Sequence, residues 1–63
     1  MKSIFITGGA SGLGKATAHR FANSGWRVCI GDINEERGEV AAKDIASQAQ
    51  SAGGSCEFVV CNV

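Results

Sequence analysis

Several features that would assign a protein to a broad class are missing from this 63-residue chain. It has no proline, no tyrosine and no net charge, because six basic residues balance six acidic ones. A neutral chain carries no electrostatic signature for a nucleic-acid backbone or an anionic membrane. No apolar run approaches the ~20 residues of a membrane span, and the N-terminal apolar run of three residues is too short for a secretory signal. We therefore expect a cytoplasmic protein that binds neither nucleic acid nor membrane.

Cysteine is present at only three positions, Cys29, Cys56 and Cys61. An odd number in a short chain argues against a disulfide framework. A zinc site is poorly supported, because there is no C-x-x-C pair and the single histidine, His19, is distant from every cysteine in the sequence. We expect three reduced and mostly buried thiols and no metal.

Short apolar runs alternate with segments of helical periodicity along the chain. The predicted elements are a strand at Ser3–Thr7, a helix from Leu13 to about Ser24, a strand at Arg27–Asp32, a helix from Glu35 to about Ala52, and a strand at Ser55–Val63. Gly25 and the pair Gly53-Gly54 follow the two helices, where a left-handed residue is favoured. Alternation of strands and helices predicts an α/β fold with a parallel sheet.

The three strands have apolar interiors, which is typical of a sheet covered on both faces. If the strands lie in the order 3-2-1, right-handed crossovers place both helices on the same face. The opposite face would then be bare within these 63 residues. We therefore expect residues 1–63 to be the N-terminal part of a single larger domain.

The glycine-rich segment Thr7–Gly14, TGGASGLG, lies between the first strand and the first helix. Gly8 permits a sharp turn out of the strand, Gly12 lets backbone approach a pyrophosphate, and Gly14 allows close packing of the helix on the sheet. The first N–H groups of a helix have no internal partner and bind anions. Asp32 ends the second strand 20 residues after Gly12, where a carboxylate can accept hydrogen bonds from a ribose.

The spacing G-x-x-x-G-x-G resembles the glycine motif of the short-chain dehydrogenase/reductase family. The resemblance extends from ITGGASGLG through Asp32 to Asn62-Val63 at the end of the third strand. It implies the N-terminal βαβαβ part of a Rossmann-type, doubly wound parallel sheet that binds NAD or NADP. It also implies an oxidoreductase that exchanges hydride between nicotinamide and an alcohol or carbonyl substrate.

The resemblance assigns cofactor contacts to particular positions. The expected cofactor-binding residues are Gly8, Ser11, Gly12, Leu13 and Gly14 for the phosphates, Asp32 and Ile33 for the adenosine ribose, and Asn62 and Val63 for the adenine. An acidic residue at position 32 would repel a 2′-phosphate, and Ser11 and Ile33 stand where members that prefer NADP often carry a basic residue. The resemblance therefore favours NAD. The family usually has Asp-Val where this chain has Asn62-Val63, and the amide oxygen of Asn62 can still accept from the adenine amino group.

The family's catalytic residues include a tyrosine and a lysine three positions after it, but this chain contains no tyrosine. The resemblance therefore implies that the catalytic residues, the substrate pocket and any contacts in a homo-oligomer lie beyond residue 63.

Two other functions stay open at this point. The segment from Gly9 to Ala16 nearly spells the phosphate-binding motif of nucleotide hydrolases and kinases, with Lys15 in the lysine position. Ala16 lacks the hydroxyl that this motif uses to bind Mg²⁺, and the motif gives Asp32 no role. The other alternative is a non-catalytic module that senses a dinucleotide, which a complete chain without Tyr-x-x-x-Lys would favour.

Overall fold

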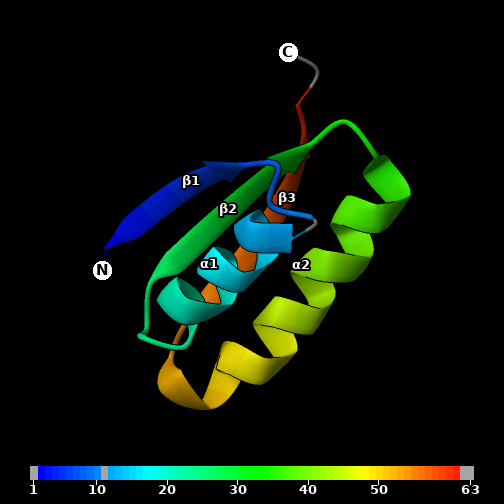
Figure 1. Cartoon of the computed structure of the whole chain (residues 1–63). Coiled ribbons are helices and arrows are strands. Elements are labelled where there is room, and N and C mark those ends of the chain that lie inside the picture. The colour runs from blue at the N-terminus through cyan, green and yellow to red at the C-terminus, as the bar shows by residue number, and fades with distance from the viewer. Residues whose placement is uncertain (1, 11, 62–63) are drawn as a thin grey trace.

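The computed structural model describes residues 2–10 and 12–61, in which strands and helices alternate (Figure 1). The elements are β1 (Ser3–Thr7), α1 (Gly12–Ala22), β2 (Arg27–Asp32), α2 (Glu35–Ala49), a 3-10 turn (Gln50–Ala52) and β3 (Ser55–Val60). Each predicted strand and helix is therefore present, and the predicted α/β class is confirmed. Asn62 and Val63, the end of the predicted third strand, lie outside the described residues.

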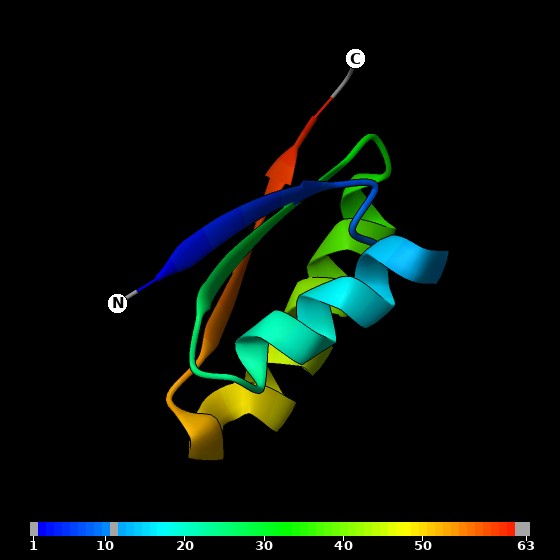
Figure 2. The ribbon, with the colours of Figure 1, turned by 60° about the vertical axis from the view of Figure 1, so that its left-hand side comes forward.

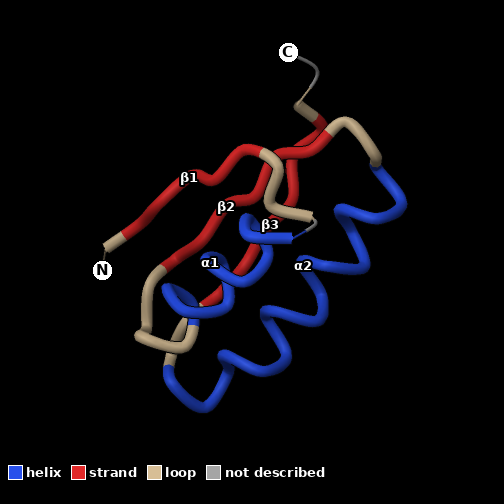
Figure 3. Tube along the Cα trace, viewed as in Figure 1, coloured by secondary structure: helices blue, strands red, loops and turns tan. Residues whose placement is uncertain are grey.

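The three strands form one parallel sheet in the order β1-β2-β3. In the middle of the sheet Phe5 pairs with Cys29, and Cys29 pairs with Glu57. Because the strands are parallel, the loops that follow β1 and β2 lie at the same end of the sheet (Figure 3). This arrangement confirms the N-terminal βαβαβ unit of a Rossmann-type sheet.

Both helices pack on the same face of the sheet, as the right-handed crossover rule predicts (Figure 2). The core lies between them and β2, where Val28, Ile30 and Ile45 are fully buried. Alanine supplies most of the remaining core, so that the helices lie close to each other and to the sheet. The second helix was predicted to run to about Ala52, but α2 ends at Ala49, and Ala52 is exposed in the 3-10 turn that follows.

The opposite face of the sheet has no helix on it among the described residues (Figure 2). Phe5 is 53% exposed and Val59 is 48% exposed there. Cys29, Cys56 and Cys61 are free and half-buried, which is less burial than expected. Cys29 lies on this uncovered face, whereas Cys56 packs against the core on the helix-covered side. The apolar side chains of Phe5 and Val59 therefore lie on a face that no described element covers.

Both helices end in the same hydrogen-bonded turn around a left-handed glycine. Gly25 has a φ of +88°, and the N–H of Trp26 donates to the carbonyl of Phe21 at 3.1 Å. Gly53, with a φ of +80°, occupies the same position after α2. This pattern is a Schellman motif, which satisfies the last carbonyls of a helix. Because this motif favours a left-handed residue after the helix, Gly25 and Gly53 predicted the helix ends to within a few residues.

Candidate functional site

The turn that follows β1 is attached to the end of β2 by backbone hydrogen bonds. The N–H groups of Gly8 and Gly9 both donate to the carbonyl of Gly31, at 2.7 and 3.2 Å. Gly8 has a φ of +68° and Gly12 a φ of +54°, a region that residues with a Cβ rarely adopt. A Cβ placed on either residue would meet nothing within 4 Å. The glycine backbone at this turn is therefore bent sharply and open on its outer side.

Gly14 lies where α1 passes over the turn. A Cβ at this position would overlap the carbonyl oxygen of Gly8, and a Cβ at Gly9 would overlap the side chain of Ile30. Because the obstacle at Gly14 is backbone, a side chain there would have to displace the turn or the helix. The expected reason for Gly14 was close packing on the sheet, and the contact that requires it is with the turn itself.

The N-terminus of α1 faces the same region with a positive electrostatic character. Its first turn, Gly12–Lys15, contains no acidic residue, and Leu13 is 86% exposed. The leading N–H groups of a helix carry partial positive charge and attract anions. Gly12, Leu13 and Gly14 therefore border an exposed helix start beside the open glycine turn.

Asp32 ends β2 next to this turn and is half-buried. Its Oδ1 accepts a hydrogen bond from the backbone N–H of Asn34 at 3.0 Å. Ile33, between them, is 68% exposed. A cavity of about 170 Å³ lies at this edge of the sheet, and its lining residues are Thr7, Gly8, Gly31, Asp32, Ile33 and Cys61. The structure thus brings together Gly8, Asp32 and Ile33 from the expected cofactor-binding set.

Gly31 is a site residue that the sequence reasoning missed. Its carbonyl accepts both hydrogen bonds from the turn, and a Cβ on it would crowd the ring of Phe5 at 2.9 Å and Cys61 at 3.0 Å. A glycine inside a strand is itself a sign of close backbone approach, so this signal was available. Three expected contacts, Ser11, Asn62 and Val63, lie outside the described residues.

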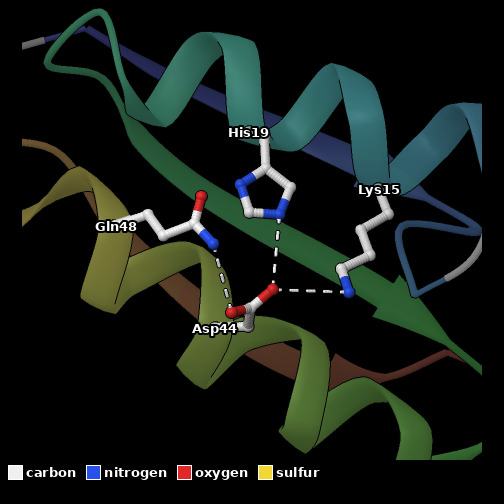
Figure 4. A network of polar contacts seen from close by, with 4 residues as sticks. All are labelled: Lys15, His19, Asp44 and Gln48. Atoms are coloured by element: carbon white, nitrogen blue, oxygen red, sulfur yellow. Dashed lines mark hydrogen bonds and ion pairs between the residues drawn. The ribbon is translucent and has the colours of Figure 1, made fainter.

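Lys15 and His19 point from α1 to Asp44 on α2 (Figure 4). The Lys15 Nζ lies 3.5 Å and the His19 Nε2 lies 3.6 Å from Asp44 Oδ2, while Gln48 donates to Asp44 Oδ1 at 3.3 Å. The helical spacing of α1 puts His19 opposite the apolar face and predicts a solvent-facing side chain, but this side chain lies between the two helices. Lys15 faces α2, which gives no support to a role as the phosphate-binding lysine of a nucleotide hydrolase.

Cys29 and Cys56 have little nucleophilic character in this environment. Burial, and to a smaller extent Cys29 and Glu57, raises the pKa of the Cys56 thiol to about 11. Burial followed by the charge of Glu57 also raises the pKa of Cys29. Both are therefore neutral thiols near pH 7, and the thiolate is the reactive form. No group of three metal-ligating side chains occurs within residues 2–10 and 12–61, and no described helix is long and apolar enough to cross a membrane.

The sequence matches the family model described as short chain dehydrogenase over residues 2–63. It is 50% identical over 58 residues to a 2,5-dichloro-2,5-cyclohexadiene-1,4-diol dehydrogenase of Sphingobium indicum, a match that covers 92% of this chain and 22% of that protein. An uncharacterized oxidoreductase of Thermotoga maritima is 41% identical over 58 residues, again covering 92% of this chain and 22% of the relative.

Solved structures show the same architecture. A citronellol catabolism dehydrogenase of Pseudomonas aeruginosa superimposes with a TM-score of 0.85 at 34% identity, over 97% of this chain and 24% of that one. A short-chain type dehydrogenase/reductase of Mycobacterium ulcerans gives a TM-score of 0.91 at 24% identity, over 97% and 22%. The chain thus spans less than a quarter of the length of these proteins.

Proposed function

Because the chain belongs to the short-chain dehydrogenase/reductase family, we propose that it is the cofactor-binding part of an NAD-dependent oxidoreductase. The observation that supports this most strongly is the attachment of the glycine turn to Gly31, beside Asp32. This attachment holds an open backbone, an exposed helix N-terminus and a carboxylate at one edge of the sheet. A dinucleotide needs all three, because its phosphates are anionic and its ribose hydroxyls are donors.

The phosphates of the cofactor would lie against the turn and the start of α1. In this proposal Gly8 and Gly12 leave room for the pyrophosphate, and the helix N–H groups stabilise its charge. Gly14 keeps the helix start close to the turn. Leu13 and Ser11 complete the phosphate contacts, and Asn62 and Val63 would contact the adenine. When bound, the nicotinamide supplies the hydride chemistry, while residues of this chain only bind and orient the cofactor.

The acidic character of the β2–α2 connection supports a preference for NAD. Asp32 would accept hydrogen bonds from the adenosine ribose, and Ile33 adds no positive charge beside it. Glu35 and Glu36 follow in the first turn of α2. A 2′-phosphate at this position would meet a carboxylate without a compensating lysine or arginine at position 33, which opposes NADP.

The remaining parts of the proposal concern the whole protein. Residues 1–63 would be the N-terminal part of one NAD-binding domain, whose continuation covers the exposed sheet face around Phe5 and Val59. The catalytic residues and the pocket for an alcohol or carbonyl substrate would belong to that continuation, as would any contacts in a homo-oligomer. Free cysteines fit a reducing compartment such as the cytoplasm.

The direct test is Asp32→Ala in the full-length protein, with NADH and NADPH affinities measured by fluorescence titration. Hydrogen bonds to a charged group contribute roughly 1.5–3 kcal/mol, so we expect the Kd for NADH to rise about tenfold or more. The Kd for NADPH should stay the same or fall, because the repelling charge is gone. Asp44→Ala, which removes an exposed carboxylate on α2 that lies outside the lining of the cavity, should leave both affinities unchanged. An unchanged preference in Asp32→Ala would remove the proposed role of this residue.

A further inference from the structure

Asn34 makes two different hydrogen bonds at the start of α2. Its backbone N–H donates to Asp32 Oδ1 at 3.0 Å. Its side-chain Oδ1 accepts from the backbone N–H of Arg37 at 2.9 Å, which caps the helix. One residue therefore joins the carboxylate at the end of β2 to the first turn of α2.

The Asp32 side chain depends on this link for its orientation. Within residues 2–10 and 12–61, the N–H of Asn34 is the hydrogen-bond donor found at its carboxylate. The backbone of Asp32 is already fixed by the sheet, since its carbonyl accepts from the N–H of Cys61 at 2.9 Å. The Asn34 N–H also fixes the direction of the Asp32 carboxylate. It occupies Oδ1 and leaves Oδ2 to accept from a ligand.

The direction of the N–H depends in turn on the cap. Asn34 has extended backbone angles, φ −93° and ψ 102°, and its carbonyl accepts the first helical hydrogen bond, from Gly38 at 2.9 Å. Loss of the side-chain acceptor would leave the Arg37 N–H without its partner and loosen the first turn. The peptide that holds Asp32 would then have more freedom, although no group that contacts a cofactor has been removed.

We propose that Asn34 is a positioning residue for cofactor selection, which acts by holding the Asp32 carboxylate toward the adenosine ribose. This inference rests on the proposed function, in which Asp32 binds that ribose. An oriented carboxylate accepts from a 2′-hydroxyl and repels a 2′-phosphate, whereas a freely rotating carboxylate can turn away from either. Discrimination between NAD and NADP therefore depends on Asn34 as well as on Asp32.

The test measures the ratio of the Kd for NADPH to the Kd for NADH in the full-length protein and its variants. Asn34→Ala should lower this ratio about fivefold, and Asn34→Ser, which restores a capping oxygen, should return it to within about twofold of the original protein. Asn34→Gly removes the same oxygen with a smaller loss of helix stability, and should lower the ratio in the same way if Asn34→Ala does not fold. Lys43→Gly, an exposed position farther along α2, destabilises the helix without touching the cap.

A double variant separates this proposal from the one on which it rests. If Asn34 acts through Asp32, adding Asn34→Ala to Asp32→Ala should leave the ratio of that single variant unchanged. Independent, additive changes would overturn the positioning role, as would Asn34→Ala and Asn34→Gly variants that keep the original ratio and lose only stability. A ratio that Lys43→Gly lowers equally would also overturn it. If Asp32→Ala itself leaves the ratio unchanged, the proposed function of Asp32 fails first.

Discussion

The two helices of this chain begin at the same edge of the sheet, but their first turns have opposite chemistry. The first turn of α1, Gly12–Lys15, has no acidic residue and presents the exposed Leu13. The first turn of α2 is capped by the Asn34 side chain and contains Glu35 and Glu36. A helix N-terminus carries partial positive charge in both cases. In α2 the chain itself supplies the compensating negative charge, whereas in α1 it does not.

This difference shows how one fold can use the same backbone feature in two ways. The charge of α2 is balanced within the chain, which stabilises the helix before any ligand arrives. In the proposed function the charge of α1 is balanced by the phosphates of the cofactor, and the glycine turn keeps side chains away from them. The proposed cofactor therefore places its phosphates at α1 and its uncharged 2′-hydroxyl beside α2.

Gly14→Ala is the substitution with the largest expected effect, because it forces the glycine turn and the start of α1 apart. The new Cβ would overlap the Gly8 carbonyl, so either the turn or α1 must move. We expect a loss of about 1–3 kcal/mol in the free energy of unfolding, measured by urea denaturation of the full-length protein. NADH affinity should fall about tenfold or more, since the turn no longer lies against the helix N-terminus.

Leu13→Ala is the matched control, because Leu13 lies on the same turn of α1 but is 86% exposed. Its free energy of unfolding should change by no more than about 0.5 kcal/mol. A Gly14→Ala protein as stable as the original would show that the turn can shift freely, and the contrast between the two helix starts would lose its structural basis.

Leu13→Glu should give α1 the acidic first turn of α2. In the absence of cofactor we expect the free energy of unfolding to rise by about 0.3–1 kcal/mol, because the glutamate complements the helix dipole. The same charge would oppose the pyrophosphate, so the Kd for NADH should rise about five- to tenfold. Stability is measured by urea denaturation and affinity by fluorescence titration, both at low salt.

Leu13→Gln separates charge from size in this experiment. It should leave NADH affinity within about twofold of the original protein, because it adds no charge near the phosphates and keeps the backbone N–H through which residue 13 would contact them. Equal losses in the glutamate and glutamine variants would indicate that the leucine side chain, and not the electrostatic character of the α1 start, determines binding.

The features that could be predicted from the sequence are those set by local spacing. Apolar runs located the strands, Gly25 and Gly53 located the helix ends, and the turn glycines located the sharp turn between β1 and α1. The contacts that were missed are between segments distant in the sequence. The Gly31 carbonyl accepts hydrogen bonds from the turn after β1, and His19 on α1 contacts Asp44 on α2. The residue pattern within one segment cannot predict these contacts, because they depend on how different segments pack together.

The burial of Cys29 shows the same limit of prediction from the sequence. Apolar neighbours around Cys29 suggested a buried thiol, which assumed that both faces of the sheet are covered. The side chain is half-buried because its face of the sheet has no described helix on it. Residue type indicated a preference for burial, but the extent of burial depends on what packs against that face.

Lys15→Met should have the smallest effect, and it tests whether the cation at the end of the α1 first turn belongs to the anion site. Lys15 pairs with Asp44 at 3.5 Å, and both side chains are more than a third exposed. Exposed pairs contribute about 0–1 kcal/mol, so we expect a loss of stability in that range that shrinks as salt is added. NADH affinity should stay within about twofold, because Lys15 points toward α2. Asp44→Asn removes the pair from the other helix together with the His19 contact, and should likewise leave NADH affinity within about twofold. A tenfold loss of NADH affinity in Lys15→Met alone would place the lysine on the phosphates, and α1 would then bind its anion with a side chain as well as with its backbone.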